Sequence, residues 1–79
     1  MGRGSGAPTT TIRNHIRAMR FAAGEMTQQD LASRVGVSRQ TLNAIEQGKY
    51  APSLEVAFRI ARVLGVRLEE AFEFVERPS

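Results

Sequence analysis

Residues 26–50 have the sequence MTQQDLASRVGVSRQTLNAIEQGKY, in which two short helical patterns stand on either side of Gly36. Thr27 and Ser38 precede these patterns, and each hydroxyl oxygen can accept a hydrogen bond from the unpaired N–H groups of a first helical turn. Asp30 follows Thr27 by three residues, at the position of the acid in a capping box. We therefore predict that one helix begins after Thr27 and another after Ser38.

Apolar residues beside these two N-caps have the spacing of a hydrophobic staple, which fixes the direction in which a chain enters a helix. The staple pairs are Met26 with Leu31 and Val37 with Leu42. Gly36 can adopt a positive φ and so end the first helix directly before the turn. Two helices of about eight residues that are joined this tightly cross steeply, which predicts a helix-turn-helix.

The flanking sequence predicts three more helices. Upstream, arginines occupy one face of a helical pattern that starts at Ile12, and the other face is apolar, with Ile12, Ile16, Met19 and Ala23. Downstream, Ser53 caps a fourth helix that Gly65 ends. Its predicted buried stripe consists of Val56, Ala57, Ile60, Ala61 and Leu64. A fifth, short helix is expected over residues 68–72.

Residues 72–76 fit two templates that periodicity alone does not separate. Alternation places Phe72 and Phe74 on one face of a strand. Helical spacing instead joins Leu68, Ala71, Phe72 and Val75. The prediction is therefore an all-α fold of five helices in which a short C-terminal β-strand remains an open alternative.

The chain has 79 residues, enough for one domain with a modest core. We assign that domain to residues 12–76. Residues 1–11 are rich in Gly, Ser, Thr and Pro and are expected to form a disordered arm, and residues 77–79 a tail.

The composition argues against several kinds of site. The chain has no cysteine and one histidine, His15, so we expect no disulfide, metal or cofactor. It also lacks both the apolar run of roughly 20 residues that spans a membrane and the apolar segment of a secretory signal, which predicts a cytoplasmic protein. Residues 1–50 carry seven Lys and Arg against three Asp and Glu, a balance that suits a polyanionic partner.

The second helix of the predicted pair has one face of hydrogen-bonding side chains. At about 100° per residue, one arc of roughly 140° contains Arg39, Gln40, Asn43, Ala44 and Gln47. Such side chains can bond to base edges in a major groove, and the alanine methyl can contact a thymine methyl. The alternative is an ordinary solvated helix face.

Residues 12–72 together resemble the phage repressor and Cro type of helix-turn-helix domain, the XRE family, which has the lambda-repressor-like fold. The resemblance lies in the segments MTQQDLA (26–32), VGVSRQTL (35–42), IEQGKY (45–50), PSL (52–54) and ARVLGV (61–66). The assembled pattern is specific, although each segment alone is not.

The resemblance implies roles for single residues. The positions that face bases are those of Arg39, Gln40, Asn43 and Ala44. The positions near the DNA backbone are those of Gln28, Ser38, Thr41, Lys49 and Tyr50. Arg20 and Glu46 match an ion pair between the first and third helices, and Gln28 is also expected to orient Arg39 or Gln40.

Two positions depart from the family pattern. The loop at residues 24–26 is one residue longer than in the shortest members, so the match of Arg20 depends on where the insertion falls. Arg67 stands where a capping Ser or Asp is usual, so the fifth helix is expected to fray. No ligand-binding domain follows in the sequence, so no small-molecule effector is expected.

Members of this family usually bind half-sites of DNA as two-fold dimers. The apolar residues Phe72, Phe74 and Val75 are the candidates for a dimer interface, although Phe72 could instead close the monomer core. The expected function is sequence-specific transcriptional regulation by a homodimeric repressor that reads double-stranded DNA with residues 39–47.

The alternative function is that of an antitoxin or adaptor, which uses the same fold mainly to bind a protein partner. Catalysis is not expected. His15 lies among arginines, and the neighbouring Glu69 and Glu70 do not converge on one point of a helix as paired catalytic carboxylates must.

Overall fold

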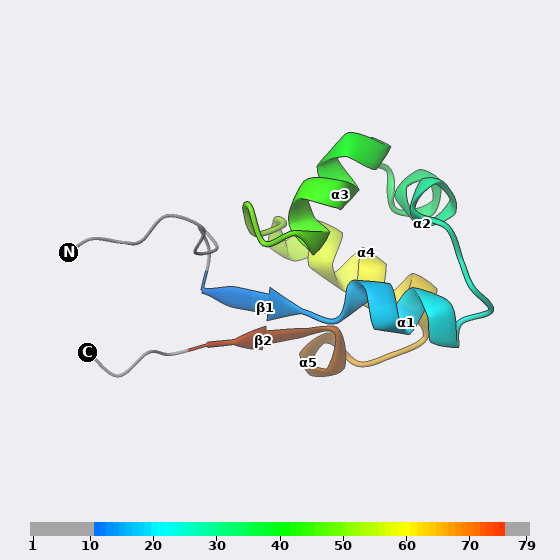
Figure 1. Ribbon diagram of the computed structural model, residues 1–79. Helices are drawn as coiled ribbons and strands as arrows, with labels where there is room; N and C mark the ends of the chain where they lie inside the picture. The colour runs from blue at the N-terminus through cyan, green and yellow to red at the C-terminus, as the bar shows by residue number, and fades with distance from the viewer. Residues whose placement is uncertain (1–10, 76–79) are drawn as a thin grey trace.

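The computed structural model describes residues 11–75, in which five helices lie between two short strands in the sequence (Figure 1). The strands are β1 (Ile12–Asn14) and β2 (Phe72–Phe74). The helices are α1 (Ile16–Ala22), α2 (Gln28–Val35), α3 (Arg39–Glu46), α4 (Leu54–Leu64) and α5 (Leu68–Ala71). The predicted tail and, apart from Thr11, the predicted arm lie outside the described residues.

Hydroxyl side chains start three of the helices, as predicted. Oγ1 of Thr27 accepts a hydrogen bond from the backbone N–H of Asp30 at 3.0 Å, and Ser38 and Ser53 do the same for α3 and α4. The predicted capping box at Asp30 is wrong. The carboxylate instead accepts a bond from Nε of Arg34, one turn further along α2.

The turn between α2 and α3 depends on Gly36, which has a φ of +84°. This conformation lets the N–H groups of Gly36 and Val37 donate to the carbonyl of Ala32, at 2.9 and 3.0 Å. The chain then reaches the Ser38 cap directly, and α2 and α3 cross steeply (Figure 1). The predicted helix-turn-helix is confirmed.

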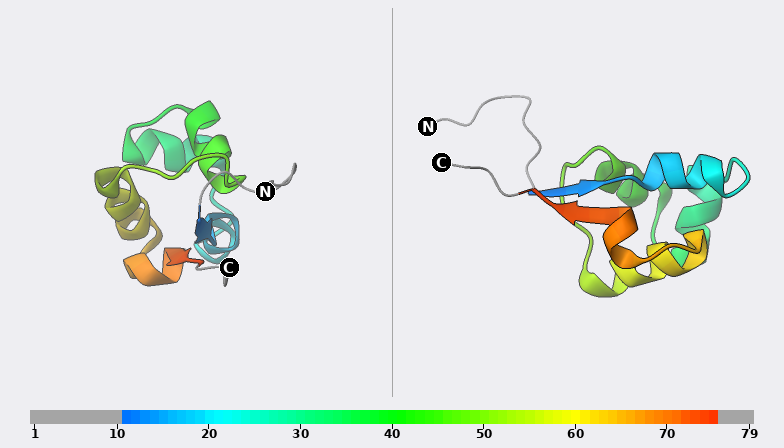
Figure 2. Two further views of the ribbon diagram at one scale, coloured as in Figure 1. Left: turned by 90° about the vertical axis from the view of Figure 1, so that its left-hand side faces the viewer. Right: turned by 90° about the horizontal axis from the view of Figure 1, so that it is seen from below.

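The prediction that the first helix begins at Ile12 is wrong. Residues 12–14 form β1, which pairs antiparallel with β2 in the register Ile12 to Phe74, Arg13 to Glu73 and Asn14 to Phe72. The open alternative for the C-terminal segment is thereby decided in favour of a strand. Figure 2 shows both strands extending together beyond the helices at one end of the molecule. We call this pair the ribbon.

Asn14 explains why the helix starts late. Its Oδ1 accepts a hydrogen bond from the backbone N–H of Ile16 at 3.1 Å, a local turn that competes with helix formation. The backbone N–H of His15 donates to the carbonyl of Ala71, so the chain is tied to α5 just before α1 begins. Ile12 keeps its helical spacing from Ile16 but packs from a strand.

The core lies among the helices. It includes the staple residues Leu31 and Leu42 and, from the predicted stripe of α4, Ala57, Ile60, Ala61 and Leu64, with Val56 packed against it. Its largest fully buried side chains are Ile16, Val35, Leu31, Leu42 and Ile60. Phe72 is only 8% exposed and belongs to this core, which favours the alternative that it closes the monomer core. Ala23, predicted to be buried, lies exposed at the C-terminal cap of α1.

Helix α5 ends one residue earlier than predicted, at Ala71. Oε1 of Glu70 accepts a hydrogen bond from the backbone N–H of Arg67 at 2.7 Å. This is the bond that the acid forms in a capping box, and it stabilises the start of this short helix. Within residues 11–75, no helix is long and apolar enough to cross a membrane.

Candidate nucleic-acid interface

Helix α3 has one face in the core and one toward solvent. Leu42 and Ile45 are buried, whereas Arg39 and Gln40 are exposed. The other residues of the predicted arc are half-buried at Asn43 and Ala44 and exposed at Gln47. The helical arc derived from the sequence is therefore present as a solvent-facing surface of mainly hydrogen-bonding groups, which we call the reading face.

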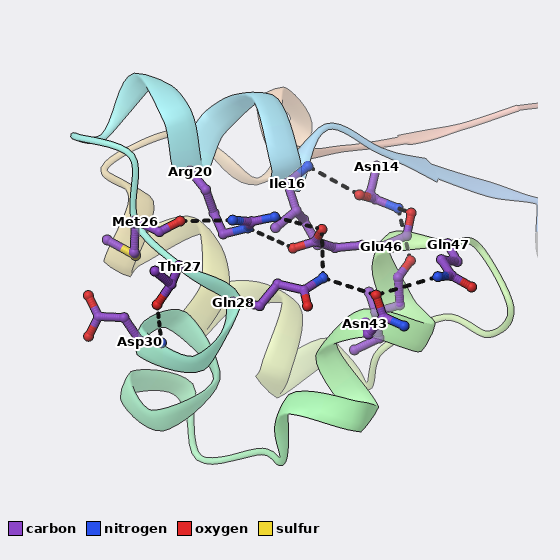
Figure 3. A network of polar contacts seen from close by, with 11 residues as sticks. Asn14, Ile16, Arg20, Met26, Thr27, Gln28, Asp30, Asn43, Glu46 and Gln47 are labelled. Atoms are coloured by element: carbon purple, nitrogen blue, oxygen red, sulfur yellow. Dashed lines mark hydrogen bonds and ion pairs between the residues drawn. The ribbon is translucent and has the colours of Figure 1, made fainter.

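Gln28, the first residue of α2, forms hydrogen bonds with the C-terminal half of α3 rather than with its first turn. Its Nε2 donates to Oδ1 of Asn43 and to Oε1 of Glu46, both at 3.1 Å (Figure 3). The expectation that Gln28 orients Arg39 or Gln40 is not met, because the side chain is directed at the C-terminal half of α3. Oδ1 of Asn43 therefore already accepts a hydrogen bond from another residue of the protein.

The predicted ion pair between Arg20 and Glu46 is present and nearly closed to solvent. Nε of Arg20 lies 2.8 Å from Oε2 of Glu46, Nη2 lies 3.1 Å from Oε1, and the two side chains are 8% and 7% exposed. Nη1 of Arg20 donates to the carbonyl of Met26 at 2.8 Å, so the longer loop contributes to the pair. A planar guanidinium suits this two-point contact.

Asn14 is a residue of this network that sequence reasoning missed. Its Nδ2 donates to the carbonyls of Ile45 and Glu46, at 2.9 and 3.3 Å, at the C-terminal end of α3 (Figure 3). The available signal was an Asn two residues before the true start of α1, a position where this side chain commonly forms a turn. A helical pattern drawn from Ile12 concealed it.

The residues predicted to face the DNA backbone lie at both ends of α3. Ser38 and Thr41 are joined by a hydroxyl hydrogen bond of 3.0 Å at its first turn. Beyond its end, Lys49 and Tyr50 are exposed, and the backbone N–H of Lys49 donates to the carbonyl of Ala44. Together with Gln28 at the start of α2, they flank the reading face.

The ribbon carries the remaining predicted residues. Phe74 is 65% exposed although it pairs with Ile12 within the sheet. Val75 is half-buried, and its N–H donates to the carbonyl of Thr11 at 2.8 Å. His15 is the N-cap of α1, and its Nε2 lies 2.8 Å from Oε1 of Glu73 in β2, so the histidine is directed toward the ribbon.

Between Thr11 and Val75, the part of the chain that the structure describes, no group of three or more His, Cys, Asp or Glu could hold a metal ion. A backbone hydrogen bond and the side chain of Arg67 lower the pKa of Glu69. The ionised form is favoured, whereas a general acid needs a raised pKa.

Comparisons with known proteins identify the family and the fold. The chain is 51% identical over 61 residues to an uncharacterized HTH-type transcriptional regulator of Methanocaldococcus jannaschii. The aligned residues cover 77% of this chain and 91% of that protein. The restriction-modification controller protein C.AhdI of Aeromonas hydrophila has a similar structure, with a TM-score of 0.64, 29% identity and coverage of 70% and 82%.

A putative DNA-binding protein of Bacteroides fragilis shares the fold, with a TM-score of 0.71, 24% identity and coverage of 78% of this chain and 98% of that one. Residues 16–70 match the model of the helix-turn-helix family, a span that includes α1 to α4 and most of α5. The chain therefore belongs to the helix-turn-helix family of HTH-type transcriptional regulators.

Proposed function

We propose that this protein is a cytoplasmic, homodimeric repressor that binds double-stranded DNA and reads its sequence through the major groove with α3. The observation that carries the proposal is the reading face, whose polar side chains are fixed by a helix that is buried on its other side. Arginine can bond guanine at two points, Asn and Gln can bond adenine, and an alanine methyl fits against thymine.

The proposed base-reading residues are Arg39, Gln40, Asn43 and Ala44. Of these, Arg39 and Gln40 lie in the first turn of α3, the part of a recognition helix that usually reaches deepest toward base edges. The proposed backbone contacts are Gln28, Ser38, Thr41, Lys49 and Tyr50. Gln28 stands at the N-terminal end of α2, where exposed N–H groups and the helix dipole attract phosphate.

A dimer is proposed because one helix-turn-helix makes too few contacts for tight and specific binding. The exposed Phe74 lies in β2 and the half-buried Val75 follows it, and within residues 11–75 no further strand pairs with β2 on its outer side. A second copy can cover both, either by packing Phe74 or by pairing strands across a two-fold axis.

Phe74→Asp is expected to raise the dimer dissociation constant by about tenfold or more, because covering a large aromatic side chain contributes about 1.5–3 kcal/mol and a buried carboxylate opposes association. Stability of the monomer should change little, since Phe74 is 65% exposed. Sedimentation velocity over a concentration series measures the change. Phe58→Asp, at an aromatic residue of α4 that is 52% exposed, is the matched control. An equal effect in both variants, or none in Phe74→Asp, would count against the ribbon interface.

Selection from random duplex DNA at two salt concentrations tests the function itself. A palindromic consensus that is recovered at both concentrations supports specific, dimeric binding. Binding without a consensus and with steep salt dependence would contradict specific reading. Absence of DNA binding would favour the antitoxin or adaptor role, and Arg39→Ala with Asn43→Ala would then leave capture of a protein partner unchanged.

A further inference from the structure

Asn14 connects three parts of the molecule through one short side chain. Its backbone pairs with Phe72 inside the ribbon, and its Oδ1 accepts the N–H of Ile16 at the start of α1. Its Nδ2 donates to the carbonyls of Ile45 and Glu46, the last two residues of α3. The ribbon is therefore bonded directly to the C-terminal end of the helix that carries the reading face.

The other contacts on that end of α3 come from elements outside the ribbon. Glu46 is held by Arg20 of α1 and by Gln28 of α2 through its carboxylate. The core residues Leu42 and Ile45 fix the depth at which α3 lies. Among the hydrogen bonds described within residues 11–75, those from Asn14 are the side-chain bonds that join α3 to a strand.

We infer that Asn14 is a positioning residue that fixes the angle between α3 and the ribbon, and thereby the separation of the two reading helices in a dimer. The step from angle to separation rests on the proposed function, because it requires the ribbon to form the dimer interface. In a two-fold dimer, a rotation of α3 relative to that interface acts on both helices and changes the DNA half-site spacing that they fit.

Asn14→Asp separates the two roles of the amide. Aspartate has nearly the same shape and keeps an oxygen for the N–H of Ile16, so the start of α1 is preserved. It has no N–H to donate, and its negative charge faces carbonyl oxygens at the C-terminal end of α3, where the helix dipole is also negative. Asn14→Ala, which loses both sets of bonds, is the comparison variant.

The first measurement uses the protein without DNA. Residual dipolar couplings report the orientation of α3 relative to β1 and β2. In Asn14→Asp, the couplings of α3 are expected to fit a different orientation relative to the strands. The couplings of α3 and of the strands, each fitted alone, should still match an unchanged helix and unchanged strands. Unchanged couplings would overturn the inference whether or not the protein binds DNA. Altered couplings support the positioning role even if the proposed function fails.

The second measurement uses the operator found by selection and two versions whose half-sites are one base pair closer together or further apart. The wild type should prefer the selected spacing. Asn14→Asp should bind that operator about tenfold more weakly while its affinity for the altered ones falls much less, so the preference flattens. A purely structural role would weaken all three operators alike, and that uniform effect would overturn the link to spacing. Failure of the wild type to bind any operator is instead a failure of the proposed function.

Discussion

Replacement of Arg20 by alanine is expected to lower the free energy of unfolding by about 3–5 kcal/mol, because it leaves the carboxylate of Glu46 buried without its cation. The same change removes the donor to the carbonyl of Met26. A domain of this size is stable by about 5–15 kcal/mol, so the change is a large fraction of the total. Urea unfolding followed by circular dichroism measures it.

The double variant Arg20→Met with Glu46→Leu is the informative control. Apolar side chains of similar volume avoid the desolvation of two buried charges, so stability is expected to return to about that of the wild type. Gln28 then loses Glu46 as one of its two acceptors. It keeps its bond to Asn43, but its side chain is held less firmly. We expect the double variant to fold normally and to bind DNA more weakly. A decrease of less than about 1 kcal/mol for Arg20→Ala alone would show that the pair is effectively solvated.

Replacement of both Arg39 and Asn43 by alanine is expected to weaken operator binding by about 1–3 kcal/mol for each base that is no longer hydrogen-bonded, and to relax the sequence preference at the corresponding base pairs. Folding should be little affected, because Arg39 is exposed, Asn43 is only half-buried and alanine favours helix. Titration of the selected operator and of single-base variants measures both effects. Gln28 keeps its bond to Glu46 in this variant, so α2 and α3 remain linked.

Lys49→Ala is the matched control for that experiment. An interaction with phosphate carries no sequence information, so affinity should fall by the same factor for every operator and the slope of log affinity against log salt should fall by about one unit. If Arg39→Ala with Asn43→Ala behaved in the same uniform way, the proposed division between base and backbone contacts would be wrong.

The parts of the fold that could be predicted from sequence are those fixed by neighbouring residues. The caps at Thr27 and Ser38 and the positive φ at Gly36 depend on groups within a few positions, and all three are present. The arc of the reading face also follows from helical period alone. Arg20 and Glu46 are far apart in sequence, and only the resemblance to a known family indicated that they meet.

The errors arose where a distant partner decides the local structure. Ile12 satisfies the helical period of α1, but pairing with Phe74 at the other end of the domain makes it a strand residue. Asn14 also lies in this strand rather than in the predicted helix, so its bonds to α3 could not be anticipated. Burial of Phe72 in the core likewise depends on where the ribbon lies against the helices.

Pairing of β1 with β2 joins the first and last described elements, and this has a consequence for the order of folding. The contacts among α2, α3 and α4 join segments that are close in sequence. Pairing of β1 with β2 instead closes a loop of chain that contains all five helices. Because closing a long loop costs more entropy than closing a short one, the helices are expected to assemble first and the ribbon last.

The ribbon is then also the part that opens most easily in the native state, since each strand has three residues. Such an opening would leave the helix-turn-helix folded while the exposed Phe74 and the amide of Asn14 left their positions together. Amide hydrogen exchange at β1 and β2 should therefore be faster than in α4, and slow down when a second copy covers the strands. If the proposed dimer forms through the ribbon, the last step of folding is coupled to the assembly of that dimer.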